Sequence, residues 1–128
     1  MDLKRKIREL DENKRVLFAM LFGSKAKGAS TKLSDIDVAI YYQGNKKERF
    51  DFLKNISGIL GKGYDIHIFQ DLPHYVQKEV IKHGKVIMTR DVRRTTEIII
   101  QTIRECSRAE KYMKFYYERL ERDAHERY

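Results

Sequence analysis

The stretch LFGSKAKGASTKLSDIDVAIYY, residues 21–42, joins two apolar runs through a small polar segment. The first run, VLFAMLF at 16–22, is apolar at every position, which is typical of a strand covered on both faces. The second run, DIDVAIYY at 35–42, reads as another strand but begins with two carboxylates, Asp35 and Asp37. Placing two neighbouring carboxylates beside an apolar strand is unfavourable unless a cation or hydrogen-bond donors offset the cost.

The rest of the chain alternates between helical and strand patterns that Gly and Pro separate. The expected helices cover 2–14, 45–60, 74–82 and 92–128, and the expected strands cover 16–22, 35–42, 64–69 and 85–89. Residues 24–34 are expected to form a turn with one short helix. This order predicts an α/β (α+β) fold with a small mixed sheet and packed helices. We expect one domain over residues 1–128, with 92–128 as a helical extension.

Two helices carry apolar rows that predict their buried faces. The row in 45–60 consists of Phe52, Ile56, Ile59 and Leu60. The row in 92–128 consists of Ile99, Ile103, Cys106, Met113, Tyr117 and Leu120, with Glu110 interrupting it. The end of this long helix is rich in aromatic residues. We expect its first half to pack on the sheet and its second half to meet a partner or a second copy.

Charge and composition bound the class of protein. The 128 residues carry a net charge of +8, and residues 1–34 hold nine Lys or Arg against four acids. A basic region ahead of the Asp pair suits an anionic substrate such as a nucleotide or RNA, although a solubilising surface explains the charge equally well. No apolar stretch is long enough for a bilayer, the charged start lacks a signal-peptide core, and Cys106 is alone, so we expect a cytoplasmic location.

The Asp pair has the chemistry of a metal site. Side chains two apart in a strand share a face, and their Cα atoms lie about 7 Å apart. Asp35 and Asp37 can therefore converge on one cation, and oxygen ligands suit Mg²⁺ that also binds substrate phosphates. Asp65, near the start of the strand YDIHIF, can complete the site if its strand lies beside 35–42. His67 shares the face of Asp65, as a site residue or only as a hydrogen-bond partner.

Gly23 and Ser24 open the turn that precedes the Asp pair. Glycine lets a backbone amide approach a ligand closely, and Ser24 adds a hydroxyl donor. Lys25 and Lys27 follow, and the spacing differs from that of a P-loop. A turn, a solvated edge or an ion pair with lysine would explain each feature alone. Their combination in one order favours a catalytic site.

This combination resembles the DNA polymerase beta-like nucleotidyltransferase superfamily. FGSKAKGASTKLSDIDVAIYY is similar to the first two strands of the family, YDIHIF to its third acidic strand, and LPHYVQKEVIKHGKVIMTR to the following segment. With its short length, the chain most resembles the minimal nucleotidyltransferases, the MntA-type antitoxins that pair with HEPN-domain toxins. Family members often carry Arg where this chain has Lys25 and Lys27, and lysine binds phosphate as a point charge without the bidentate fork of arginine.

The resemblance implies both an activity and a set of roles. Asp35 and Asp37 would bind Mg²⁺ and bridge it to ATP, and Asp65 would complete a two-ion site and help deprotonate the acceptor. The nucleotide-binding residues would be Gly23, Ser24, Lys25 and Lys27. AMP would pass to a tyrosine of the HEPN RNase toxin and silence it. The alternatives are an antitoxin that acts by binding alone and a nucleotidyltransferase for RNA or a small molecule, with RNA the weaker candidate because no second domain could grip it.

Overall fold

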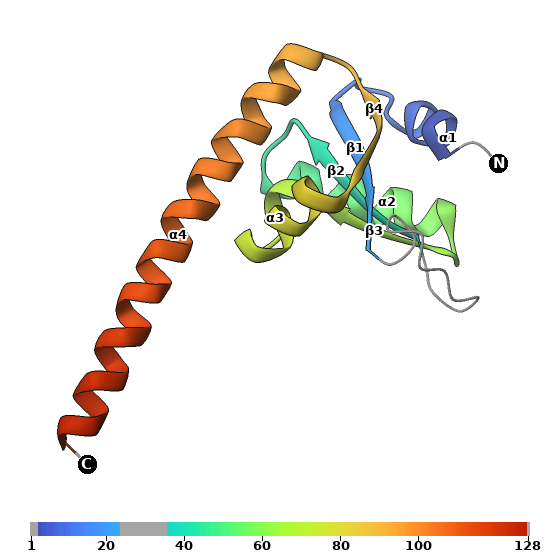
Figure 1. The fold of residues 1–128 in the computed structure, drawn as a ribbon. Helices are drawn as coiled ribbons and strands as arrows, with labels where there is room; N and C mark the ends of the chain where they lie inside the picture. The colour runs from blue at the N-terminus through green and yellow to red at the C-terminus, as the bar shows by residue number, and fades with distance from the viewer. Residues whose placement is uncertain (1–2, 24–35, 128) are drawn as a thin grey trace.

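The computed structural model describes residues 3–23 and 36–127, and Figure 1 shows their arrangement. The elements in chain order are α1 Leu3–Leu10, β1 Val16–Phe22, β2 Ile36–Tyr42, α2 Lys46–Leu60, β3 Tyr64–Ile68, the short 3-10 helix η1 Phe69–Asp71, α3 His74–His83, β4 Lys85–Thr89 and α4 Val92–Arg127. This order confirms the expected fold class. The main difference is at Phe69, which begins η1 instead of ending β3.

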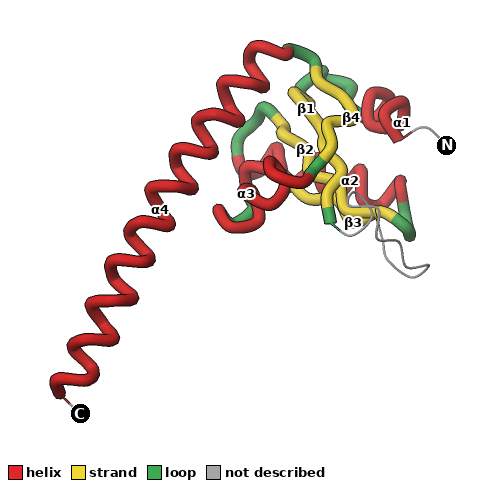
Figure 2. The backbone as a smooth tube through the Cα atoms, viewed as in Figure 1, coloured by secondary structure: helices red, strands yellow, loops and turns green. Residues whose placement is uncertain are grey.

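The four strands form one mixed sheet in the order β3-β2-β1-β4. β1 pairs antiparallel with both β2 and β4, whereas β2 and β3 run parallel. β1 therefore lies inside the sheet, in agreement with its continuous apolar run, and its first five residues are buried. The parallel register places the starts of β2 and β3 at the same end of the sheet, whose strands are drawn in yellow in Figure 2.

Helices cover both faces of this sheet. On one face, Ile7 of α1 and Ile56 of α2 pack with Val38 and Ile40 of β2. On the other face, Val80 of α3 joins a second cluster. The other members of that cluster are Leu17, Phe18, Met20, Ala39 and Phe69, with Ile98 of α4 against it. Side chains that alternate along β2 thus enter two different cores, and Asp37 shares the α3–α4 side with Ala39.

The aspartate Asp11 fixes the entry into β1. Its carboxylate accepts hydrogen bonds from the backbone N–H groups of Arg15 and Val16, at 2.9 and 2.8 Å. Arg90, just beyond β4, adds an ion pair at 3.1 Å. The side chain of Asp11 is 1% exposed, so this buried charge is satisfied by three donors. It ties the end of α1 to the start of β1 and the end of β4.

The predicted apolar rows need correction in both helices. Ile59 is 54% exposed, and Leu53 packs against the core instead. In α4, Cys106 of the predicted row is buried together with Thr95 and Thr102, whereas Ile103 is 46% exposed. The row missed the two threonines because threonine can lie in an apolar interface when its hydroxyl is satisfied. The Thr102 hydroxyl donates to the carbonyl of Ile98 at 2.7 Å.

Helix α4 has a packed half and a projecting half, as Figure 1 shows. The first half contacts α3, and an ion pair of 2.7 Å between Lys78 and Glu110 marks the far end of that contact. Beyond it, the large side chains Tyr112, Met113, Phe115, Tyr116, Tyr117 and Leu120 are each at least 53% exposed. We call these six residues the tail patch. Among the described helices, none is long and apolar enough to cross a membrane.

Candidate active site

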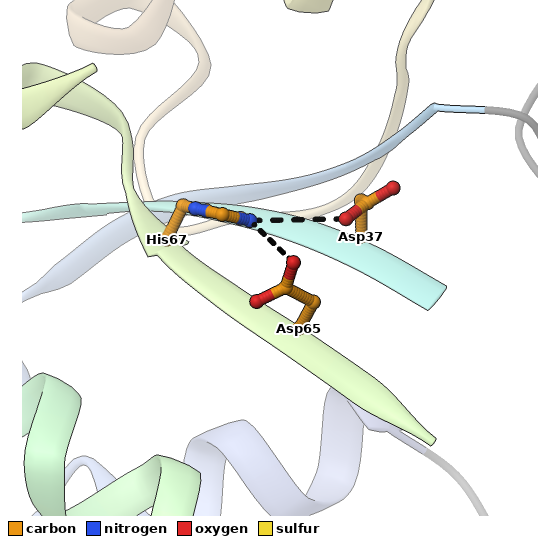
Figure 3. Close-up of side chains that lie close together, drawn as sticks. All are labelled: Asp37, Asp65 and His67. Atoms are coloured by element: carbon orange, nitrogen blue, oxygen red, sulfur yellow. Dashed lines mark ion pairs between the residues drawn. The ribbon is translucent and has the colours of Figure 1, made fainter. Parts of the chain in front are cut away.

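Three polar side chains meet where β2 and β3 begin (Figure 3). The parallel register pairs Asp37 with Asp65 and Ala39 with His67. Since alternate residues of a strand share a face, Asp37, Asp65 and His67 all project to the same side of the sheet. Two adjacent strands thus bring Asp37 together with residues that lie twenty-eight and thirty positions further along the sequence.

The contacts within this cluster are short. His67 Nε2 lies 3.1 Å from Oδ2 of Asp65 and 3.7 Å from Oδ1 of Asp37. One ligand atom from each of the three residues lies within 4.8 Å of the others, which is close enough to share one cation. The side chain of Asp65 is 53% exposed, while those of Asp37 and His67 are 28% and 32% exposed. The cluster is therefore open to a ligand from the side of Asp65.

Gly23 lies directly against Asp37. Its φ is +83°, a conformation that favours glycine. A Cβ atom built on Gly23 would also collide with Oδ2 of Asp37, so any other residue here would strain the backbone and force the carboxylate to move. The antiparallel register of Phe22 with Asp37 produces this approach. Gly23 and the carboxylate of Asp37 therefore form one continuous surface.

The cluster carries unfavourable negative charge. Partial burial raises the pKa of Asp37 above its ordinary value, and repulsion from Asp65 raises it further, while His67 opposes both effects. A cation beside the carboxylates would remove this cost. Two carboxylates also provide the oxygen ligands that Mg²⁺ prefers, so the residues present fit a magnesium site.

The structure brings together Gly23, Asp37 and Asp65, as the sequence predicted. It also places His67 in the cluster, on the face that its spacing of two from Asp65 indicated. The predicted site residues Ser24, Lys25, Lys27 and Asp35 lie outside the described residues. Tyr41, further along β2, stacks on Phe18 with ring centroids 5.4 Å apart.

A polar hollow of about 470 Å³ lies on the same side of the sheet, near the start of α4. Its lining includes Tyr41, Gln70, Gln77 and Arg94. Tyr41 lies four positions beyond Asp37 along β2, about 13 Å away at the rise of a strand. The hollow is therefore separate from the carboxylate cluster.

Comparisons with known proteins agree with this geometry. The family model described as polymerase beta, nucleotidyltransferase matches residues 5–93. A protein of Methanocaldococcus jannaschii with the provisional name protein adenylyltransferase is 44% identical over 73 residues, covering 57% of this chain and 56% of the relative. The chain thus spans about half the length of this curated relative.

Solved structures share the fold over nearly the whole chain. A chain from the crystal structure of a toxin–antitoxin with AMP-PNP has a TM-score of 0.71 at 17% identity, covering 93% of this chain and 98% of that chain. A chain from the complex of the tri-AMPylated Shewanella oneidensis HEPN toxin with its MNT antitoxin has a TM-score of 0.64 at 16% identity, covering 91% and 94%. At these identities the likeness establishes a common fold.

Proposed function

Because the chain belongs to the polymerase beta nucleotidyltransferase family, we propose that it is a Mg²⁺-dependent protein adenylyltransferase and the antitoxin of a toxin–antitoxin pair. It transfers AMP from ATP to a tyrosine of a HEPN-family RNase toxin and thereby neutralises that toxin. The observation that carries this proposal is the pair of carboxylates, Asp37 and Asp65, beside the glycine turn at Gly23. The name of the archaeal relative and the complexes that share the fold support the choice of acceptor.

The carboxylates of Asp35, Asp37 and Asp65 would form a binding site for two Mg²⁺ ions. Bound Mg²⁺ would neutralise the carboxylates and the phosphates of ATP and so allow the nucleotide to approach. Gly23 and Ser24 would offer backbone and hydroxyl donors to the triphosphate. Lys25 and Lys27 would add positive charge as point charges instead of the bidentate fork of arginine.

The reaction is an in-line displacement at the α-phosphorus of ATP. The tyrosine oxygen of the acceptor forms the new O–P bond, the bond to the β-phosphate oxygen breaks, and pyrophosphate leaves. Asp65 receives the proton of the tyrosine hydroxyl, and its 53% exposure leaves it accessible to a protein acceptor. Asp37, which is more buried, holds the nucleotide end of the site.

We assign the tail patch to partner recognition. Residues 92–128 form the extension beyond the catalytic unit, since the family match ends at residue 93, where α4 has just begun. Exposed apolar side chains of this size are typical of protein interfaces. The occupant is the toxin, which makes a hetero-oligomer, and self-association through the same helix is the alternative. We expect the pair to act in the cytoplasm.

Intact-mass measurement tests the activity. The protein is mixed with ATP, Mg²⁺ and the HEPN-family toxin proposed as its partner, and we expect the toxin to gain whole AMP units. Asp37→Ala should abolish this gain, whereas Asp51→Ala, at an exposed acid of α2, should preserve it. Neutralisation of the toxin by Asp37→Ala without any mass gain would favour an antitoxin that acts by binding alone. Transfer of label from ATP to RNA would favour the alternative acceptor.

Calorimetry with the toxin tests the tail patch. Tyr116→Ala with Leu120→Ala should weaken binding at least tenfold, because two exposed anchors are removed. Phe50→Ala removes a comparably exposed aromatic side chain, 61% exposed, from α2 and should leave binding unchanged. A dimer of this protein alone that the double variant disrupts would favour self-association.

A further inference from the structure

We propose that His67 is a positioning residue that holds the carboxylate of Asp65 in its working orientation. This inference rests on the proposed function, because it concerns the group that binds the metal and receives the acceptor's proton. His67 Nε2 is 3.1 Å from Oδ2 of Asp65, within hydrogen-bonding distance, but 3.7 Å from Oδ1 of Asp37. The proposed hydrogen bond runs from the imidazole N–H to Oδ2 of Asp65, the nearer carboxylate, and leaves Oδ1 of Asp65 available for the site.

The surroundings of the ring fix this geometry. Ala39 faces His67 across the parallel pair, and its small side chain leaves space for an imidazole beside β2. The ring of Phe22 lies on another side, with its centroid 5.6 Å from that of His67 and the planes tilted by 60°. Phe22 is also the register partner of Asp37 in the β1–β2 pair, so its contact with His67 places the imidazole ring at the level of the carboxylates.

Asp65 needs such a partner because of where it lies. β3 is an edge strand, and the Asp65 side chain is 53% exposed, so its carboxylate has freedom to rotate. Among residues 3–23 and 36–127, the ion-pair partner of Asp65 is His67. A donor that holds one carboxylate oxygen reduces that freedom and directs the other oxygen. Loss of such a partner around a metal site typically costs 10- to 100-fold in metal affinity or activity.

A different role for His67 would be direct coordination of the metal, because its nitrogen is among the three close ligand atoms. The two roles make opposite demands on Nε2. A positioning residue keeps a proton on Nε2 and uses this N–H as a hydrogen-bond donor to Asp65, whereas a metal ligand must offer a lone pair from the same atom. Spectroscopy of a bound metal can therefore separate them.

The experiment compares His67→Phe, His67→Gln and the control His83→Gln. Phenylalanine keeps a ring beside Phe22 without a donor, and glutamine restores an N–H of similar reach. His83 is an exposed histidine of α3 outside the cluster. Mn²⁺ serves as the probe for the metal, with its affinity measured by electron paramagnetic resonance, and AMP transfer to the toxin is followed in parallel.

We expect His67→Phe to weaken Mn²⁺ binding at least tenfold and to lower kcat at least tenfold, with the KM for ATP changed less than threefold. His67→Gln should recover both quantities to within about fivefold of the wild type, and His83→Gln should match the wild type. Spin-echo spectra of bound Mn²⁺ should lack coupling to a directly bound histidine nitrogen.

Direct nitrogen coupling that disappears in His67→Phe would overturn the proposal in favour of a ligand. Unchanged Mn²⁺ affinity and kcat in a folded His67→Phe would overturn it as well, while the proposed function would stand. The converse outcome is that the variants change Mn²⁺ affinity as expected while the wild type transfers no AMP to the toxin. That result would contradict the proposed function and support the role of His67.

Discussion

Replacement of Gly23 by alanine tests how closely the backbone at this glycine and the carboxylate of Asp37 depend on each other. Two separate costs are expected. The φ of +83° places any other residue in a left-handed conformation, which costs about 1–2 kcal/mol. The new Cβ also collides with Oδ2 of Asp37, and relief of that collision forces the carboxylate off its rotamer at a further cost of about 1 kcal/mol.

The predicted loss for Gly23→Ala is therefore about 2–3 kcal/mol of unfolding free energy. Gly63→Ala provides the matched control, because Gly63 has a φ of +99° with nothing within 4 Å of an added Cβ. It should cost about 1–2 kcal/mol, from backbone strain alone. Activity should separate the two variants more strongly, since a carboxylate displaced by about 1 Å can lower the rate about 100-fold.

Urea unfolding and AMP transfer are measured for both glycine variants, and for Gly23→Ala in an Asp37→Ala background. Removal of the carboxylate removes the collision, so the cost of Gly23→Ala should fall by about 1 kcal/mol in that background. The same cost in both backgrounds would refute the collision. A Gly23→Ala enzyme with the full activity of the wild type would refute the link between the turn and the site.

Three further predictions concern single side chains. Asp37→Asn should abolish metal binding yet stabilise the metal-free protein by less than about 1 kcal/mol, because burial raises the pKa of Asp37 and makes its charged form unfavourable. This gain in stability should be largest at neutral pH and should vanish as the pH falls below the ordinary pKa of 3.8. Thermal melts of the variant and the wild type should then coincide. Asp11→Ala should cost about 2–4 kcal/mol in urea titrations, since the N–H groups of Arg15 and Val16 lose their acceptor, and Asp11→Asn should cost less. Burial raises the pKa of the Cys106 thiol, so iodoacetamide should modify it at least tenfold more slowly in the folded protein than in urea.

Each of these predictions has a clear contrary result. Equal melting temperatures of Asp37→Asn and the wild type at neutral pH would show that the charge at this position costs nothing. A loss below 1 kcal/mol for Asp11→Ala would mean that water satisfies the freed donors. Equal rates of Cys106 modification in both states would contradict its burial beneath His74, whose carbonyl accepts from the thiol at 3.3 Å.

The sequence predicted the order of helices and strands well because local signals set it. Gly61 ends α2 within one residue of the expected position, and Pro73 precedes α3 as expected. The pairing of Asp37 with Asp65 was foreseeable from strand alternation, given that the two strands lie side by side. These features depend on residues that are close in the sequence or on a single pairing choice.

The remaining features depend on contacts between distant segments. The burial of Asp11 requires Arg90, which follows a strand at the other end of the catalytic unit. Thr95 is buried because its hydroxyl meets that of Thr89 at 2.8 Å, a pair that apolar periodicity cannot reveal. Likewise, the spacing alone left the role of His67 open, because the distances to two carboxylates come only from the register of β2 and β3.

The division of α4 into a packed and a projecting half has a consequence for the lifetime of the protein. A helical segment without neighbours is marginal in water, so the projecting turns should fray and exchange their amide protons rapidly. A partner that binds the folded segment alone suppresses this opening, and at a concentration 100 times its Kd it adds about 2.7 kcal/mol to stability. Since α4 continues without a break into the contact with α3, that stabilisation extends to the catalytic sheet. A protease that recognises the frayed end would then remove the unbound chains and spare those in a complex.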